Sequence, residues 1–257
     1  MEAKIRKPAV AGSFYAGDAK ELCQDVQNCF SRCKNPLMEN VQAVIVPHAG
    51  YVFSGVTAAS AFAAINPDAE YEHIFLLGPS HHVYLGKASV NIGASAYATP
   101  LGNVPVDTAL CKDLMEKSDA ITYAPEAHES EHCLEVELPF LQYHMKKIPS
   151  IVPIIIATQE LTTLKKIADT LKPYLNEKNL FVISSDFSHY PAYKDAEIVD
   201  GLTKDSIMTG KVEAFVNATL HNQELGIDHL ATSACGMAPI ATLLMMTEND
   251  ANIKPHH

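Results

Sequence analysis

The chain lacks several patterns that would assign it to a common class of protein. It has no run of eighteen apolar residues and no apolar segment behind its first residues, so we expect neither a membrane span nor a secretory signal. Its six cysteines include no CxxC pair, which excludes a zinc ribbon and a thioredoxin motif. Basic residues are few: 19 Lys and Arg against 30 Asp and Glu give a net charge of −11, which argues against nucleic-acid and anionic-membrane partners. We therefore expect a soluble, cytoplasmic protein.

The chain does contain an alternation of apolar, β-branched runs with helical segments. The apolar runs predict strands over 41–47, 73–79, 87–93, 150–156 and 179–186. The spacing of apolar residues predicts helices over 19–33, 54–65, 107–117, 131–145 and 160–175, and a mostly helical last seventy residues. This order is typical of one domain, residues 1–257, with a three-layer α/β/α architecture around a central mixed or largely parallel sheet.

Histidines and acidic residues gather where the apolar runs stop. His48 follows VIVP, His81 and His82 follow FLLGPS, and Asp186 and His189 follow FVISS. Because ligands bind outside the carboxyl ends of the strands in open α/β folds, we expect these side chains to converge on one pocket. Their chemistry suits a metal ion, a phosphate-like anion or both.

Two of these positions require a choice of orientation or role. His81 and His82 are adjacent and point to opposite sides of an extended chain, so we expect His81 in the pocket and His82 beside it or packed. The spacing of Asp186 and His189 suits a proton-transferring imidazole whose ring the carboxylate orients, or a carboxylate that binds the metal directly. The alternative is an aspartate that caps the next turn.

Three further segments offer polar groups to such a pocket. In EAHESEHCLEVELPF, Glu131 and His132 are candidates for the pocket rim, and the alternative is an ordinary solvated helix face. Tyr51 is a candidate hydrogen-bond donor to a ligand, whereas Ser54 is expected to cap a helix. Cys235 precedes a predicted helix, whose N-terminus stabilises a thiolate as ligand or nucleophile; otherwise it is a buried, inert thiol.

Six strings in order along nearly the whole chain resemble the Memo family: KPAVAGSFYAGD, VPHAGYVFSG, GPSHH, EHCLEVELPFLQ, SSDFSHY and TSACGMAPI. The resemblance implies a fold like that of the catalytic subunit of class III extradiol dioxygenases, which hold non-haem Fe(II) with two histidines and one carboxylate. Bacterial and archaeal members of the family are associated with radical SAM proteins in the AmmeMemoRadiSam system. The chain thus resembles protein B of that system.

The same resemblance implies a set of site residues. It puts the metal-site positions at His48, His81 and Cys235, where a thiol replaces the carboxylate of the dioxygenases, and it puts the acid–base group at Asp186 and His189. A donor set of two imidazoles and one thiolate is softer than that of the dioxygenases. The resemblance implies Fe(II), and the softer donor set also suits copper or Zn(II).

Two classes of function follow. The first is a metal-dependent oxidoreductase, related to the dioxygenases, that acts on a small or cyclic organic substrate beside the ion. The second is a non-catalytic binding or accessory protein whose cleft holds a peptide, an anion or a metal for a partner such as a radical SAM protein. A hydrolase with Cys235 as nucleophile and His189 as base is a third hypothesis.

Overall fold

The central feature of the computed structural model, which describes residues 4–33 and 37–257, is a twisted sheet between two layers of helices. Within the described residues this sheet has six strands in the order β2-β9-β3-β8-β4-β7. Their bounds are β2 (Ala43–Val46), β3 (His73–Pro79), β4 (Lys87–Val90), β7 (Ile121–Thr122), β8 (Ser150–Ala157) and β9 (Asn179–Ser184). β2, β9, β3 and β8 are parallel, and β4 runs antiparallel to β8. The sheet is therefore mixed, with a parallel half.

A second, smaller sheet pairs β1 (Lys4–Arg6) in parallel with β5 (Ala94–Thr99), and β5 in antiparallel with β6 (Gly102–Pro105). These short strands were not predicted. β5 reads ASAYAT and β6 reads GNVP, so neither has the apolar, β-branched run that marked the long strands. The predicted strand over 87–93 ends earlier than expected, at Val90.

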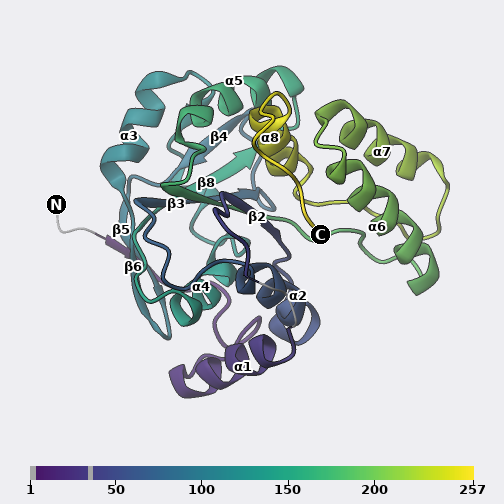
Figure 1. The fold of residues 1–257 in the computed structure, drawn as a ribbon. Coiled ribbons are helices and arrows are strands. Elements are labelled where there is room, and N and C mark those ends of the chain that lie inside the picture. Colours follow the sequence, from purple (N-terminus) through teal and green to yellow (C-terminus); the bar gives the residue numbers. More distant parts are fainter. Residues whose placement is uncertain (1–3, 34–36) are drawn as a thin grey trace.

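Helices cover both faces of the large sheet, and Figure 1 shows the layers edge-on. One layer holds α1 (Ala19–Ser31), α2 (Tyr51–Ala63) and α4 (Leu138–His144), and the other holds α3 (Thr108–Lys117), α5 (Leu161–Leu171) and α8 (Met237–Thr247). A hairpin of α6 (Tyr193–Met208) and α7 (Val212–Glu224) packs beside α8 at one edge. The three-layer α/β/α prediction is confirmed.

The core lies between the layers and follows from the apolar runs. Ile74, Phe75, Leu76 and Leu77 of β3 are fully buried, as expected of a central parallel strand covered on both faces. Burying one such side chain stabilises the fold by about 1.5–3 kcal/mol. No helix among the described residues is long and apolar enough to cross a bilayer.

Two helix predictions needed correction at their first residues. The helix predicted from Ser54 begins at Tyr51, and the Ser54 hydroxyl donates to the Ala49 carbonyl, 3.1 Å away, instead of capping. The helix predicted over 131–145 is a short 3-10 turn at Glu135–Glu137 followed by α4, because the Glu131 and Glu135 side chains accept from distant backbone N–H groups. Asp18 caps α1 as predicted, accepting from the amides of residues 20 and 21.

The sheet order brings the predicted site residues together. β9 lies between β2 and β3, and all three strands are parallel, so their carboxyl ends meet at one edge. His48, Asp186 and His81 each lie two residues beyond the last residue of one of these strands. α8 contacts β3 and β9, and its first turn follows Cys235, so the thiol arrives at the same edge.

Candidate metal centre

The loop after β2 is tied to the loop after β9 by one carboxylate. The backbone N–H groups of His48 and Ala49 both donate to Asp186 Oδ1, at 2.8 and 3.2 Å. The other oxygen, Oδ2, lies 3.9 Å from His48 Nε2. Asp186 thus positions the backbone that carries His48, and within the described part of the chain it has no hydrogen bond to His189.

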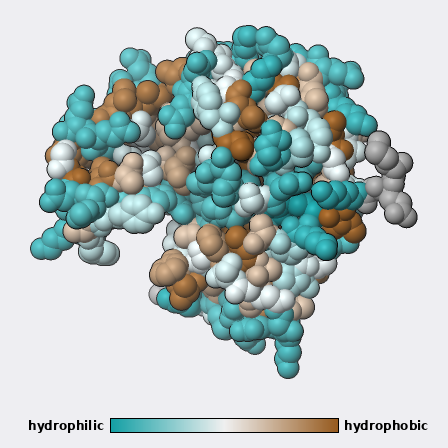
Figure 2. Space-filling model, turned by 180° about the vertical axis from the view of Figure 1, so that it is seen from behind, coloured by the Kyte–Doolittle hydropathy of each residue, from teal (hydrophilic) through white to brown (hydrophobic). Residues whose placement is uncertain are grey.

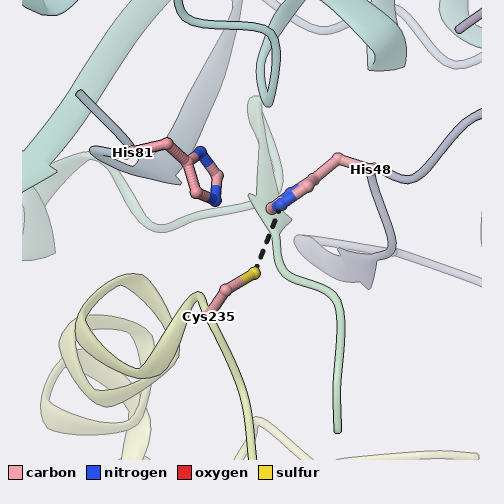
Figure 3. Close-up of side chains that lie close together, drawn as sticks. All are labelled: His48, His81 and Cys235. Atoms are coloured by element: carbon pink, nitrogen blue, oxygen red, sulfur yellow. Dashed lines mark hydrogen bonds between the residues drawn. The ribbon is translucent and has the colours of Figure 1, made fainter. Parts of the chain in front are cut away.

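The ring of His48 is 2% exposed and lies between a hydroxyl and a thiol. Its Nδ1 is 2.6 Å from Ser184 Oγ, and its Nε2 is 3.2 Å from Cys235 Sγ, the contact drawn in Figure 3. Burial is the main reason that the pKa of His48 falls from 6.5 to about 3, against the opposing charge of Asp186. The imidazole is therefore neutral, as a metal ligand must be.

His81, at the end of β3, is held by a buried carboxylate. Glu131 Oε1 lies 2.9 Å from His81 Nδ1, and Oε2 accepts from the His81 backbone N–H at 2.8 Å. Burial raises the pKa of Glu131, but the hydrogen bonds from His81 outweigh it and lower that pKa to about 2. Because an ionised carboxylate only accepts, Nδ1 of His81 carries a proton and Nε2 faces the site.

The charge state of His81 in the metal-free protein differs from that of His48. Burial lowers the pKa of His81, yet its hydrogen bonds to Cys235 and Glu131 and their charges outweigh that effect and raise the pKa to about 10. The ring is less enclosed, with 28% of the side chain exposed. His81 therefore forms a charged pair with Glu131 at the mouth of the site.

Cys235 reaches the imidazoles because two loops lie unusually close. Its N–H donates to the Asp186 carbonyl at 3.2 Å, and the Asp186 N–H points at Sγ, 3.3 Å away. Gly236 packs against Ser185 so tightly that a Cβ at that position would lie 2.4 Å from the serine Cβ. Only glycine allows this approach, so Gly236 sets the place of the thiol.

The three predicted ligand positions come together in space. One donor atom from each of His48, His81 and Cys235 lies within 4.8 Å of the other two, and the two ring centroids are 5.2 Å apart. This group could hold a metal ion, since two neutral imidazoles and a thiolate are donors for zinc, copper and iron. The described residues contain two further groups of this kind, His81 with Glu131 and Cys133, and His82 with Glu131 and His132.

His132 is a third imidazole in contact with the first two. Its ring stacks on His81 with centroids 4.8 Å apart and meets His48 edge-on at 5.4 Å. Phe14 of the N-terminal segment covers it from another side, at 4.9 Å. Burial lowers the pKa of His132, so this ring too is neutral. His82, by contrast, is exposed.

Other predicted site residues lie elsewhere or are engaged by the fold. The Tyr51 hydroxyl donates to the Val136 carbonyl at 2.7 Å and is buried, so it is not free for a ligand. His189 has Nδ1 bonded to the Phe187 carbonyl at 2.9 Å. Among the described residues, no hydrogen bond or ion pair joins His189 to the thiol; the imidazoles beside Cys235 are those of His48 and His81.

The glutamates at positions 131, 135 and 137 do not form a solvated face. Glu131, Glu135 and Glu137 are 3%, 0% and 0% exposed. Glu135 pairs with Arg6 at 2.7 Å and also accepts from the Tyr15 hydroxyl at 2.6 Å, which ties the N-terminal strand to this segment. The solvated-face hypothesis was wrong because each carboxylate has a distant partner that the local pattern could not reveal.

Sequence reasoning missed Ser184 and Glu137, which lie behind His48. A signal existed for both. Ser184 follows four apolar residues at the end of its strand, and Glu137 interrupts the apolar run LEVELPFL, where a carboxylate needs a partner.

Comparison with known proteins agrees with these observations. Residues 6–255 match the family described as Memo-like protein. A MEMO1 family protein of Nitrosopumilus maritimus is 32% identical over 259 residues, which is 97% of this chain and 90% of that protein. One from Aeropyrum pernix is 35% identical over 251 residues (93% and 86%), and one from Schizosaccharomyces pombe is 37% identical over 198 residues (74% and 62%).

A solved structure, that of the uncharacterized protein JW3007 from Escherichia coli K12, aligns with 72% of this chain and 78% of its own. The TM-score is 0.48 and the sequence identity 16%. The fold and site define an α/β/α protein with imidazole and thiol side chains at the carboxyl edge of a parallel half-sheet. The chain belongs to the Memo-like protein family.

Proposed function

We propose that the chain binds one metal ion through His48, His81 and Cys235, and that it uses this ion as an oxidoreductase related to the extradiol dioxygenases. One observation carries the proposal. In both imidazoles Nδ1 is engaged by the protein, through Ser184 for His48 and Glu131 for His81, while Nε2 is turned toward the thiol. Metal-ligating histidines commonly show this arrangement, in which a partner on one nitrogen orients the other toward the ion.

The donor set fits a redox-active ion with open positions. Three protein ligands leave coordination positions for substrate, as in catalytic metal sites. Two imidazoles and a thiolate suit Fe(II), which we propose as the native ion, and also copper or Zn(II). A bound Fe(II) ion would supply electron transfer and a site at which an organic substrate and a co-substrate meet.

Residues of the chain would handle protons around the ion. We propose His189 as the acid–base group, because the Phe187 carbonyl accepts the Nδ1 proton and leaves the Nε2 lone pair free. His132 stacks on His81 and is neutral, so it can accept a hydrogen bond from a ligand at the same mouth. Asp186 keeps His48 in place through the backbone.

A binding role for the same cleft is the second candidate, and exposed apolar side chains favour it. Val52 and Phe53, four and five residues after His48, are 87% and 85% exposed, and Tyr190, next to His189, is 78% exposed. Figure 2 shows hydrophobic surface on the α1–α2 side of a notch that separates this part of the molecule from α6 and α7. Such side chains would hold a peptide or a partner protein over the site.

The experiment begins with protein purified without oxygen, because a thiolate beside iron is easily oxidised. Metal content and anomalous scattering from a crystal identify and place the ion. We expect one ion per chain, and a loss of affinity on the order of 100-fold or more in His48→Ala and Cys235→Ala. His221→Ala, an exposed histidine on α7, serves as the control.

Oxygen consumption with catechol-like substrates then separates the two candidates. Turnover by the iron-loaded protein that disappears in His48→Ala supports the oxidoreductase. Stoichiometric metal with no oxygen consumption across a broad set of substrates favours the binding role. Wild-type protein that binds no metal at all contradicts the proposed function.

A further inference from the structure

Behind His48, one hydroxyl contacts three buried groups. Ser184 Oγ lies 2.6 Å from His48 Nδ1, 2.7 Å from the Cys133 carbonyl and 3.0 Å from Glu137 Oε1. Ser184, Cys133 and Glu137 are all 0% exposed. The distances alone do not say which group donates in each hydrogen bond, but the number of available protons does.

A serine hydroxyl has a single proton to donate, and the count fixes where it goes. The Cys133 carbonyl can only accept, and it lies closer to Oγ than the Glu137 carboxyl does. Because the carbonyl brings no proton of its own, its 2.7 Å contact with Oγ requires the serine proton, which therefore goes to Cys133 and points away from the imidazole. Ser184 must therefore accept from His48, so Nδ1 carries the ring proton and Nε2 presents its lone pair to Cys235.

Glu137 completes the arrangement without adding a charge. It forms no salt bridge among the described residues. Burial raises its pKa well above 4.5, and the charge of Asp186 adds to this, against the opposing hydrogen bond with Ser184. The carboxyl is thus protonated and can donate to Ser184 while the serine donates to Cys133.

We propose that Ser184 is a positioning residue that fixes His48 in the Nδ1–H tautomer, with Glu137 as the neutral acid that holds the serine hydroxyl in place. This proposal deepens the proposed metal site and rests on it for its consequence in metal binding. The orientation of His48 itself exists without metal. Glu131 does the corresponding work for His81 with a charged group.

The test reads the tautomer directly in the metal-free protein. Nitrogen-15 chemical shifts of the His48 ring should show a protonated Nδ1 and an unprotonated Nε2 in the wild type. Ser184→Ala should give a mixture of tautomers, and Ser184→Thr, which keeps the hydroxyl, should restore the single form. A matched control is Ser89→Ala, since Ser89 is also fully buried and lies 3.0 Å from a histidine, His128 Nε2, outside the site.

Co(II) alone is the probe for metal binding. We expect Ser184→Ala to weaken Co(II) affinity by about 10–100-fold, with Ser184→Thr close to wild type and Ser89→Ala unchanged. Glu137→Gln should keep the His48 tautomer, because the amide N–H can donate to Ser184 as the protonated acid does.

The outcomes separate the two proposals. An unprotonated Nδ1 in wild-type His48 overturns the positioning role, even if Ser184→Ala does not fold. A folded Ser184→Ala variant with an unchanged tautomer and unchanged Co(II) affinity also overturns it. If the tautomer shifts as expected but wild-type protein binds neither Co(II) nor iron, the positioning role stands and the proposed metal function fails.

Discussion

The candidate site has two walls, a charged one formed by His81 and Glu131 and a neutral one formed by His48 and Ser184. Each wall holds the Nδ1 proton of an imidazole, but with a different kind of partner. On one wall Glu131, ionised, holds the Nδ1 proton of His81 at 2.9 Å; on the other Ser184, uncharged, holds that of His48 at 2.6 Å. The His81 side chain is 28% exposed and the His48 side chain 2%. Glu131 is itself buried, and the charge on His81 and three backbone N–H groups compensate its charge. His48 instead has a neutral chain of hydrogen bonds behind it.

This difference has a chemical consequence for metal binding. His48 is neutral in the metal-free protein and needs no change to coordinate an ion, since its pKa is lowered to about 3 by burial. His81 carries a proton that the ion must displace. Binding of metal at neutral pH should therefore release a proton from His81.

The largest effect should come from breaking both walls at once. Arg6 pairs with Glu135 at 2.7 Å, and its other nitrogens donate to the carbonyls of His128 and Glu131. Arg6 therefore holds in place the segment that carries Glu131 and Glu137, the carboxyl groups behind the two walls. Arg6→Met leaves Glu135 buried without its cation and should lower the free energy of unfolding by about 3–5 kcal/mol in urea titrations.

The control for this change is Lys165→Met, which removes an exposed ion pair with Asp169 and should cost less than about 0.5 kcal/mol. A loss below about 1 kcal/mol for Arg6→Met would show that Glu135 finds another partner or protonates at little cost.

The next effect tests the charged wall alone. Glu131→Gln removes the charge beside His81 and should weaken Co(II) affinity by about 10–100-fold, because the carboxylate both orients the ring and strengthens it as a ligand. Glu129→Gln, at an exposed neighbouring position paired with Lys4, is the matched control. Equal affinities for the two variants would mean that Glu131 has no part in holding the ligand.

A pH titration should then distinguish the two walls, because the pKa values of their histidines are shifted in opposite directions. In the metal-free protein the pKa of His81 is raised from 6.5 to about 10, so its contribution to stability is complete below pH 6.5 and is lost as pH rises toward 10. The pKa of His48 is lowered to about 3, so its neutral burial costs stability as pH falls from 6.5 toward 3. Ring nitrogen shifts measured from pH 4 to 10 check both directions, and a normal midpoint for His81 would contradict the charged wall.

The smallest effect concerns the neighbour of His81. His82 is exposed and does not belong to the group of His48, His81 and Cys235, so His82→Asn should change Co(II) affinity by no more than about 2-fold, which is the scale of an ordinary surface substitution. Competition titrations on the two proteins measure it. A change comparable to that of Glu131→Gln would make His82 a ligand through the group that it forms with Glu131 and His132.

Much of the fold could be predicted from the sequence because its long strands are continuous apolar runs. β3, β8 and β9 are buried on both faces, and the composition of such strands is enough to predict them. Strands β5 and β6 could not be found in this way, because they carry small and polar residues and are held by pairing with each other and with β1.

The part of the candidate site that the sheet positions could be predicted from the sequence. His48 and His81 follow strands, so their convergence is a matter of topology. The partners of these rings come from segments about fifty and one hundred and forty residues away, Glu131 for His81 and Ser184 for His48, and no local spacing encodes such a contact. For the same reason the helical spacing of 131–145 misled us: buried carboxylates, each with a remote partner, decide that backbone instead.

Two glycines decide how near the segments come. A side-chain carbon on Gly78 would lie 2.4 Å from Cys133 Sγ, and one on Gly236 would lie 2.4 Å from the Ser185 Cβ. The geometry around the imidazoles and the thiol thus depends in part on the absence of a side chain at these two positions. A single added methyl at either place would spread the donors apart without altering any of them, so the capacity to chelate can be lost while every donor is retained.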